Sequence, residues 1–324
     1  MLPKPLLTIL VPVFNEEKVV PLFFERMAPV LSKLSAEYRV NLVFIDNCST
    51  DGTRESILRV RERFPETYLV ALSRNVGYQR GLEAGLRHSD GDLFVFIDVD
   101  CEDPPEMIPD FVSIHGEGAD IVYGERVDRE EASWIKLLRK LFYRVLRAVA
   151  DDEVILDMAE FSLLTREVRD TIVQDLSSYP FIRASIGRVG FRRRGIPYRR
   201  GRRIAGQTHY NFWEMTEFAV AGILSSSTLF LRLPIYLLGP WLVGMTILAS
   251  LMVLRPSPWV APVTIALGFG FCGASLSFLC MYMARTYKNT LGRPNAFVLE
   301  RFSLLQPPRE ATTAATSTPV SARP

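Results

Sequence analysis

The stretch "FVFIDVDCEDPPEMI", residues 94–108, carries an apolar run directly into Asp98, Asp100, Glu102 and Asp103, with two prolines after them. A carboxylate is costly to bury unless it is paired with, or bound to, a cation. An apolar strand that ends in a cluster of acids therefore needs a positive partner at its end. We expect that partner to be a divalent metal ion that carries a diphosphate.

The spacing of the first two acids suits metal binding. Alternate side chains of a strand point the same way, so Asp98 and Asp100 can direct two carboxylates at one cation. Hard cations such as Mg²⁺ prefer oxygen ligands and keep positions open for substrate phosphates, and a cation held in this way neutralises a diphosphate leaving group. An Asp-x-Asp pair alone is a weak signal, but here an apolar strand precedes it and "PPE" follows it.

On both sides of this stretch, short apolar runs alternate with longer amphipathic segments. Strands buried on both faces have nearly continuous apolar sequences, and their alternation with helices predicts an α/β fold with a parallel sheet covered by helices. The expected strands lie at residues 6–14, 40–46, 67–73, 92–98 and 119–124, and the expected helices at about 16–34, 52–63, 77–88 and 105–115.

Two of the predicted strands end in an aspartate, the second in Asp46 and the fourth in Asp98. In parallel sheets, ligands bind beyond the carboxyl ends of the strands. Two acids at equivalent ends of separate strands therefore predict one shared site.

The charge of the chain is almost balanced, with 38 Lys and Arg against 36 Asp and Glu in 324 residues, which does not suggest nucleic-acid binding. Its distribution is uneven, because residues 183–203 hold nine arginines and no acid. We expect residues 191–203 to lie near lipid headgroups, where each basic residue contributes about 1 kcal/mol. The four cysteines form no C-x-x-C pair and the three histidines are scattered, which argues against a disulfide framework and a zinc site.

Two long uncharged segments, residues 233–254 and 259–284, follow the α/β region. At a rise of about 1.5 Å per residue, each can cross a hydrocarbon core of roughly 30 Å. A buried hairpin of soluble helices is the alternative. Arg232 precedes the pair and Arg285 follows it, whereas the short loop between them has Arg255 alone. The positive-inside rule thus predicts an integral membrane protein with both termini in the cytoplasm. The expected location is the plasma (inner) membrane.

Two amphipathic segments accompany the apolar pair. The first, residues 134–150, has one basic face, which predicts either a soluble helix or an interfacial one. The second, residues 211–232, leads into the first apolar segment.

Small residues in the second apolar segment, such as Gly268, allow close helix contact, so a homo-oligomer is an open expectation. The predicted organisation is a cytoplasmic domain at 1–210, a juxtamembrane amphipathic helix at 211–232, the hairpin at 233–284, and a cytoplasmic tail at 285–324 that is disordered from about 305.

Several motifs together resemble one known family. They are "LVPVFNEE", "FIDNCSTDGT", "SRNVGYQRGLEAGL", "DVDCEDPPEMI", "DIVYGER" and "RIAGQTHY", in this order along the chain. The set is similar to that of the polyprenyl-phosphate glycosyltransferases of glycosyltransferase family 2, which include dolichol-phosphate mannose synthases and bacterial undecaprenyl-phosphate glucosyltransferases. The resemblance implies a GT-A fold with a Rossmann-like nucleotide-binding sheet. It also implies inverting, metal-dependent transfer of a sugar from a nucleotide sugar to a polyprenyl phosphate, for modification of cell-envelope glycans.

The resemblance also implies a role for individual positions. Asp98, Asp100 and Glu160 would be the catalytic residues, and Asp98 would contact the nucleotide sugar as well. The other implied roles are nucleotide-sugar contacts at Pro12, Phe14, Glu16, Asp46 and Asn47; Mg²⁺ or Mn²⁺ ligands at Asp98, Asp100 and Glu102; an acid facing the acceptor at Glu160; and phosphate contacts at Arg126, Arg203, Gln207 and His209.

Some of these positions depart from the residues usual in the family. The retention of Asp46, Asp98 and Asp100 favours an active enzyme over a non-catalytic membrane scaffold that keeps the fold. UDP-glucose is the first expectation for the donor, with GDP-mannose and UDP-amino sugars as alternatives. The departures are Asn47 for Asp, Cys48 for Gly, Glu102 for Gln, Glu160 for Asp, Gln207 for Glu and His209 for Lys.

Overall fold

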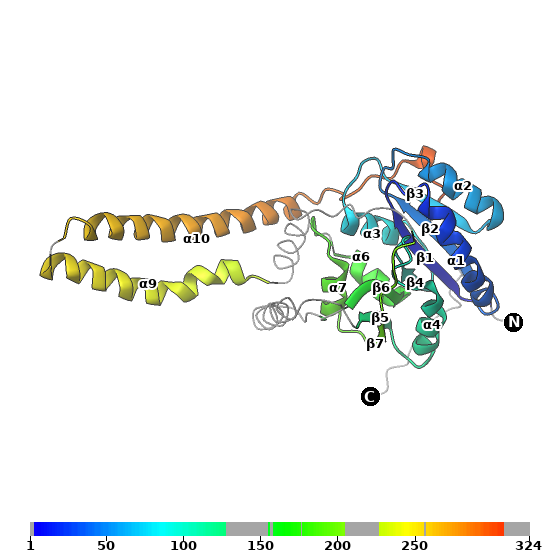
Figure 1. Cartoon of the computed structure of the whole chain (residues 1–324), viewed down its shortest axis with the longest axis horizontal. Coiled ribbons are helices and arrows are strands. Elements are labelled where there is room, and N and C mark those ends of the chain that lie inside the picture. The colour runs from blue at the N-terminus through cyan, green and yellow to red at the C-terminus, as the bar shows by residue number, and fades with distance from the viewer. Residues whose placement is uncertain are drawn as a thin grey trace, which may run out of the picture.

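The computed structural model describes residues 3–127, 155, 158–175, 177–204, 227–255 and 257–307. In this part of the chain, seven strands form one sheet in the order β3-β2-β1-β4-β6-β5-β7 (Figure 1). The first four strands in this order are mutually parallel, as expected. They are β1 (Leu6–Val13), β2 (Arg39–Asp46), β3 (Thr67–Ala71) and β4 (Leu93–Phe96).

The other half of the sheet contains a reversed strand, β6 (Met158–Thr165). It pairs antiparallel with β4 on one side and with β5 (Ile121–Arg126) on the other, and β7 (Arg193–Tyr198) runs parallel to β5. The predicted α/β class is confirmed, but the expectation of a purely parallel sheet is wrong because β6 runs against its neighbours. The first residues of β6 therefore lie at the edge where β4 ends.

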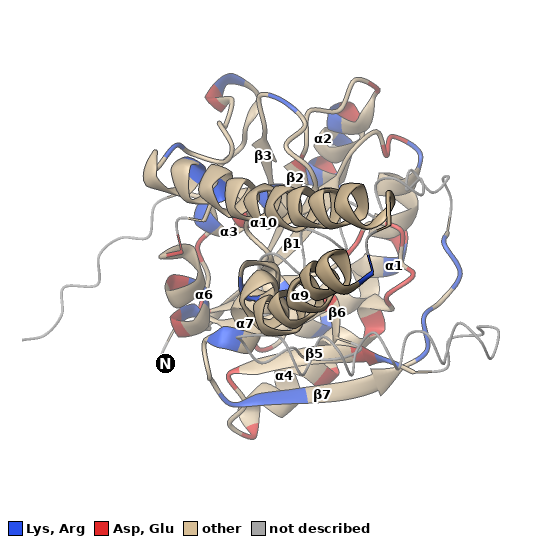
Figure 2. Ribbon diagram, turned by 90° about the vertical axis from the view of Figure 1, so that its left-hand side faces the viewer, with Lys and Arg blue, Asp and Glu red and all other residues tan. Residues whose placement is uncertain are grey.

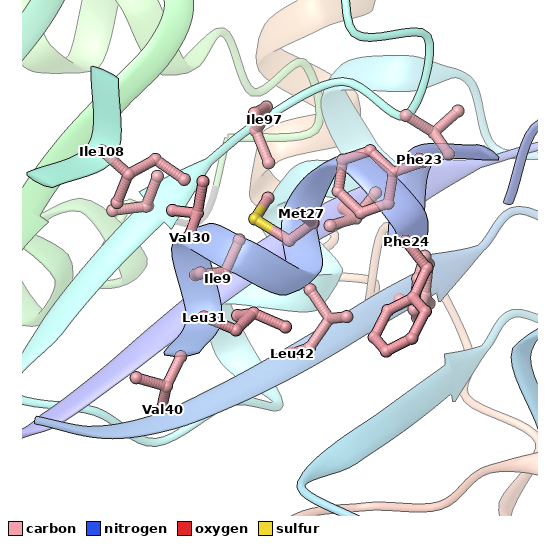
Figure 3. Packing of buried hydrophobic residues seen from close by; sticks show 14 of the residues in the cluster. Ile9, Phe23, Phe24, Met27, Val30, Leu31, Val40, Leu42, Ile97 and Ile108 are labelled. Atoms are coloured by element: carbon pink, nitrogen blue, oxygen red, sulfur yellow. The ribbon is translucent and has the colours of Figure 1, made fainter. Parts of the chain in front are cut away.

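Helices cover both faces of the sheet, because alternate side chains of its strands point to opposite sides. On β1, Ile9 belongs to one apolar cluster and Leu10 to the other. Figure 3 shows Met27 of α1 lying over the sheet close to Ile9, with Phe23 farther along the same helix. One face packs against α1 (Val19–Leu34), α2 (Thr53–Arg63) and α4 (Ile108–Gly116), and the other against α3 (Tyr78–Arg87), α6 (Arg166–Val173) and α7 (Ile182–Arg188).

Three turns at the carboxyl edge of the parallel strands hold a non-glycine residue in the left-handed region. Asn15 follows β1 with φ 56°, Cys48 follows β2 with φ 67°, and Cys101 follows β4 with φ 54°. For most side chains this conformation costs about 1–2 kcal/mol. Such strained positions cluster at functional sites, so these three turns indicate a functional site at this edge of the sheet.

The two apolar segments form long helices, α9 (Leu229–Leu254) and α10 (Val260–Thr290), which project together from the domain (Figure 1). Trp241 of α9 stacks on Phe271 of α10 with ring centroids 4.7 Å apart. Both helices are long and apolar enough to cross a membrane, and no residue of either is buried in the described structure. A buried soluble hairpin, the alternative interpretation, is therefore not what the chain forms.

After α10 the chain returns to the domain and binds along β3, the edge strand of the sheet (Figure 1). Leu69 and Leu304 exchange two backbone hydrogen bonds of 2.9 and 2.8 Å, and the amide of Ala71 donates to Ser303 Oγ at 3.0 Å. Farther along, Gln306 Oε1 accepts from the amide of Asp90 at 2.7 Å. The segment 296–306, which includes a 3₁₀ turn at Glu300–Phe302, thus covers an otherwise open sheet edge.

Several predicted features lie outside the described residues. They are the amphipathic segment 134–150, most of the juxtamembrane helix expected at 211–232, and the tail from residue 308 onward. The last four residues of that juxtamembrane segment belong to the first turn of α9.

Candidate active site

A cavity of about 800 Å³ opens at the carboxyl edge of β1, β2 and β4. Its position agrees with the expectation that ligands bind beyond the carboxyl ends of parallel strands. The cavity brings together nine of the residues predicted from the sequence. These are Pro12, Phe14, Glu16, Asn47, Asp98, Asp100, Arg126, Glu160 and Arg203.

Asp98, just beyond the end of β4, is held among other acids. Its Oδ1 accepts a hydrogen bond of 2.7 Å from the hydroxyl of Tyr78 at the start of α3. Burial raises the pKa of the Asp98 carboxyl to about 7, and the nearby charges of Asp103 and Asp100 act in the same direction. The site thus concentrates negative charge around Asp98, as a cation site does.

Asp100 and Glu102 face arginines of the segment that follows β7. Arg203 forms an ion pair with Asp100, with Nη2 3.0 Å from Oδ2, and its Nε donates to Glu102 Oε1 at 3.3 Å. Arg200 forms a further ion pair with Glu102. A backbone hydrogen bond also links the two segments, since the amide of Ile204 donates to the Asp100 carbonyl at 3.1 Å. Asp100 lies in the cavity wall, whereas Glu102 does not.

The donor set at this edge fits a divalent cation in its chemistry. Two carboxylates, Asp98 and Asp100, line the same cavity, and burial raises the pKa of both. The neighbouring charges of Asp103 and Asp100 add to this effect at Asp98, and that of Glu102 adds to it at Asp100. Oxygen ligands of this kind are the ones that Mg²⁺ and Mn²⁺ take. Among the described residues, however, no three acid, histidine or cysteine side chains converge as metal ligands. Glu102, the third ligand expected from the sequence, is engaged with Arg200 and Arg203 instead.

Asp46 has a structural position rather than one in the cavity. Its side chain is fully buried, with Oδ2 2.5 Å from Arg54 Nε and Oδ1 accepting from the amide of Ser49 at 2.8 Å. The next residue, Asn47, does line the cavity. Its amide group donates to Asn75 Oδ1 and its oxygen accepts from the amide of Val76, both at 2.9 Å. Of this pair it is therefore Asn47 that shapes the cavity wall.

Glu160 reaches the site because β6 is reversed. In the β4–β6 pairing Phe96 lies opposite Ser162, and the same register continued past the end of β4 brings Asp98 opposite Glu160. Glu160 Oε1 accepts from Gln79 Nε2 at 2.8 Å and from Arg183 Nε at 2.7 Å. Its other oxygen, Oε2, is buried and has no hydrogen-bond partner among the described residues. A ligand hydroxyl would satisfy that oxygen.

Arg126, at the end of β5, supplies fixed positive charge to the cavity. Its Nη2 lies 3.4 Å from Asp103 Oδ2 and its Nε donates to the Tyr198 hydroxyl at 3.2 Å, while Tyr198 donates in turn to Asp103. Burial opposes the charged form of Arg126, but the charge of Asp103 and the hydrogen bond to the Tyr198 oxygen outweigh it and raise the pKa of Arg126. The guanidinium therefore stays charged and oriented.

The structure adds residues that the sequence interpretation did not assign to the site. Tyr78, Gln79 and Arg80 lie in the cavity wall at the start of α3. They belong to the motif "SRNVGYQRGLEAGL", which contributed to the family resemblance although none of its residues was assigned a role. Arg183 was seen only as part of a basic stretch, yet it lines the cavity and holds Glu160. Gln207 and His209 lie outside the described residues.

Most of that basic stretch is engaged within the chain. Besides Arg200 and Arg203, four of its arginines form ion pairs with acids of the described residues. These pairs are Arg183 with Glu160, Arg188 with Asp175, Arg192 with Asp120 and Arg194 with Glu117. The arginines thus neutralise the protein's own acids, whatever they also do near lipid headgroups.

The sequence profile of Glycosyl transferase family 2 matches residues 8–173, from β1 through α6. The chain belongs to this family and is a glycosyltransferase. This agrees with the resemblance carried by its motifs.

Individual relatives extend the likeness beyond the family domain. The chain is 31% identical to the prophage bactoprenol glucosyl transferase homolog of Escherichia coli (strain K12), over 91% of this chain and 98% of that protein. It is 30% identical to the bactoprenol glucosyl transferase of Shigella phage SfX, over 91% of this chain and 99% of that one. Alignments that cover this much of the chain extend beyond the family domain and include the apolar helices.

Among solved structures, the mannosyltransferase PcManGT from Pyrobaculum calidifontis, in complex with GDP-Man and Mn²⁺, superposes with a TM-score of 0.44. The sequence identity is 19%, and the superposition covers 89% of this chain and 87% of that one.

Proposed function

We propose that this glycosyltransferase transfers a sugar from a nucleotide sugar, first of all glucose from UDP-glucose, to a polyprenyl phosphate at the cytoplasmic face of the membrane. The observation that carries the proposal is the cavity that joins Asp98 and Asp100 to Glu160, Arg126 and Arg203. Similarity to bactoprenol glucosyl transferases over more than nine tenths of both chains supports a polyprenyl-phosphate acceptor.

The nucleotide would bind between the turn after β1 and the loop before α3. Pro12, Phe14 and Val76 give this part of the wall apolar surface for a base, and Glu16 adds a hydrogen-bond acceptor. Asn47 holds the loop through its bonds to Asn75 and Val76, so it positions the wall rather than offering a free amide. Asp46 acts beneath it as a buried partner of Arg54.

Asp98 and Asp100 are the residues that would hold Mg²⁺ or Mn²⁺. When bound, such a cation neutralises the charge that develops on a departing diphosphate. Arg203, which already reaches Asp100, and Arg126, which is fixed by Asp103, would contact phosphate oxygens. Arginine suits this task because its planar fork matches phosphate geometry.

The acceptor needs no general base. A phosphate monoester has a second pKa of about 6, so at neutral pH it is largely a dianion and can attack the anomeric carbon directly. The protein's task is then alignment and charge neutralisation. In this scheme Glu160 Oε2 accepts a hydrogen bond from a sugar hydroxyl, and attack from the face opposite the nucleotide inverts the anomeric centre.

Transfer into lipid tests the proposal. Membranes that contain the chain are supplied with polyprenyl phosphate and, one at a time, with labelled UDP-glucose, GDP-mannose and a UDP-amino sugar. We expect label in the lipid extract from one donor and the inverted anomer by NMR. Neither labelled lipid nor released nucleoside diphosphate with any donor would instead favour a non-catalytic scaffold.

A further inference from the structure

Tyr179, in the wall of the cavity, is surrounded by three cations from two separate elements. The guanidinium carbon of Arg80, on α3, lies 5.4 Å from the centroid of its ring, and that of Arg285, near the end of α10, lies 4.6 Å away. The ammonium of Lys288 lies 5.2 Å from the centroid and donates to the Tyr179 hydroxyl at 2.7 Å. We call these four residues the Tyr179 cluster.

The positive charge of the Tyr179 cluster is not balanced by acids within the described structure. None of its three cations forms an ion pair with a described carboxylate, although arginines elsewhere in the domain commonly do. Arg80 donates instead to the carbonyl of Ser178, at 2.9 and 3.2 Å. An aromatic face attracts each cation by only about 0.5–2 kcal/mol, which leaves three like charges close together. An anion with several acceptor oxygens would complete the arrangement.

The cluster lies where the membrane helices meet the cavity. Arg285 and Lys288 follow the long uncharged part of α10, at the level that lipid headgroups occupy at the end of a span. Figure 2 shows basic positions in blue at the end of α10 that lies nearest the domain. Arg285 of α10 and Arg80 of α3 contact the same tyrosine ring there. Tyr179 and Arg80 belong to the wall of the same cavity as Asp98. The amide of Ser178 also donates to Asn289 of α10 at 2.9 Å, which fixes this junction.

We propose that the Tyr179 cluster is the docking site for the phosphate monoester of the polyprenyl acceptor. The phosphate would pass from the headgroup level to Arg285 and Lys288, and from there into the cavity along Arg80. The apolar neighbours of Tyr179 in the wall, Pro180 and Phe181, would contact the first part of the prenyl chain. This inference rests on the proposed function, because it names where that function's lipid substrate is held.

The test compares the acceptor and donor requirements of single variants. Arg285→Gln and Lys288→Gln should each raise the KM for polyprenyl phosphate about tenfold, the equivalent of about 1.4 kcal/mol. The KM for the nucleotide sugar should stay within about twofold, which also shows that the domain is folded. Arg293→Gln is the matched control, because Arg293 is exposed, follows the same helix and carries the same charge. Its KM for polyprenyl phosphate should not change.

A binding measurement separates this inference from the proposed function. Retention of labelled polyprenyl phosphate by the purified, detergent-solubilised chain should fall in Arg285→Gln and Lys288→Gln but not in Arg293→Gln, whether or not sugar transfer is seen. Equal retention by all three overturns the inference even if transfer is normal. A second arm repeats the retention measurement with labelled phosphatidylglycerol in place of polyprenyl phosphate. If the two variants lose binding equally in both arms, the cluster is a general membrane anchor and the inference is wrong.

Discussion

Glu160 Oε1 is engaged by Gln79 and Arg183, while Oε2 is buried and without a partner among the described residues. Glu160→Gln keeps the shape but removes the charge that Arg183 faces. Hydrogen bonds to charged groups contribute about 1.5–3 kcal/mol. We therefore expect kcat to fall roughly ten- to hundredfold. Turnover measured with saturating substrates checks this.

The matched control for this substitution is Glu167→Gln. Glu167 is an exposed acid in the first turn of α6, and its replacement should leave kcat unchanged. A double-mutant cycle with Arg183→Gln should show strong coupling, since the two side chains form one ion pair. Near-normal turnover of Glu160→Gln would remove Glu160 from the account of the site.

Cys48 occupies a backbone position that suits glycine, with φ 67°. Cys48→Gly removes a conformational cost of about 1–2 kcal/mol and adds some chain entropy on unfolding, so a net gain of about 0.5–1 kcal/mol is expected. The corresponding rise in Tm is roughly 1–4 °C, which thermal unfolding in detergent can measure.

Two further variants make the Cys48 result interpretable. Cys48→Val should lower Tm, because a β-branched side chain tolerates positive φ poorly. Cys101→Gly should bring no gain although Cys101 has φ 54°, because its side chain is fully buried and its removal leaves a cavity. A fall in Tm for Cys48→Gly would show that the Cys48 side chain contributes more stability than its positive φ costs.

At the level of elements, the segment after α10 has a structural function that was not predicted from its sequence. Residues 296–306 pair with β3 and bind Asp90, so they protect the edge of the sheet. A chain that ends at residue 295 should therefore unfold at lower temperature and aggregate. A chain that ends at residue 307 keeps all of these contacts and should have an unchanged Tm. Equal Tm values for the two truncations would contradict this role.

The strands that apolar continuity predicted are those of the parallel half and β5, each found within a few residues of its expected bounds. Apolar continuity does not predict β6, because Glu160 and Ser162 interrupt the apolar pattern of "MAEFSLLT". It does not predict β7 either, because "RRGIPY" is an arginine-rich edge strand. Both strands owe their place to pairing with distant partners, which local composition does not encode.

The site was predictable to the same extent as the sheet. Asp98 and Asp100 follow a recognisable strand, so their place at the carboxyl edge could be derived from the sequence. The meeting of Asp98 with Glu160 could not, because it depends on the reversed direction of β6. Arg80 and Lys288 are 208 positions apart in the sequence numbering, and only the return of α10 to the domain joins them on one tyrosine ring.

For the whole molecule, the docking of residues 296–306 on β3 holds the end of the hairpin beside the catalytic domain. We therefore propose that both lie on the same side of the membrane. With the positive-inside rule, this predicts a cytoplasmic domain and an external loop around Ser257. In intact cells, a membrane-impermeant maleimide should label Ser257→Cys and not Glu300→Cys, which should react only after permeabilisation. Labelling of Glu300→Cys in intact cells would reverse the proposed orientation.

The proposed function depends on Asp98 and Asp100, which would hold a divalent ion that promotes departure of the nucleotide during transfer to lipid. The most direct measurement is sugar transfer into the lipid extract by the unmodified chain, Asp98→Asn and Asp100→Asn, with and without EDTA. We expect each variant to lose at least roughly a hundredfold in rate, and EDTA to abolish transfer until Mg²⁺ or Mn²⁺ is restored. Asp110→Asn, an exposed acid on α4, should behave as the unmodified chain. Undiminished transfer in EDTA, or in both variants, would contradict the account.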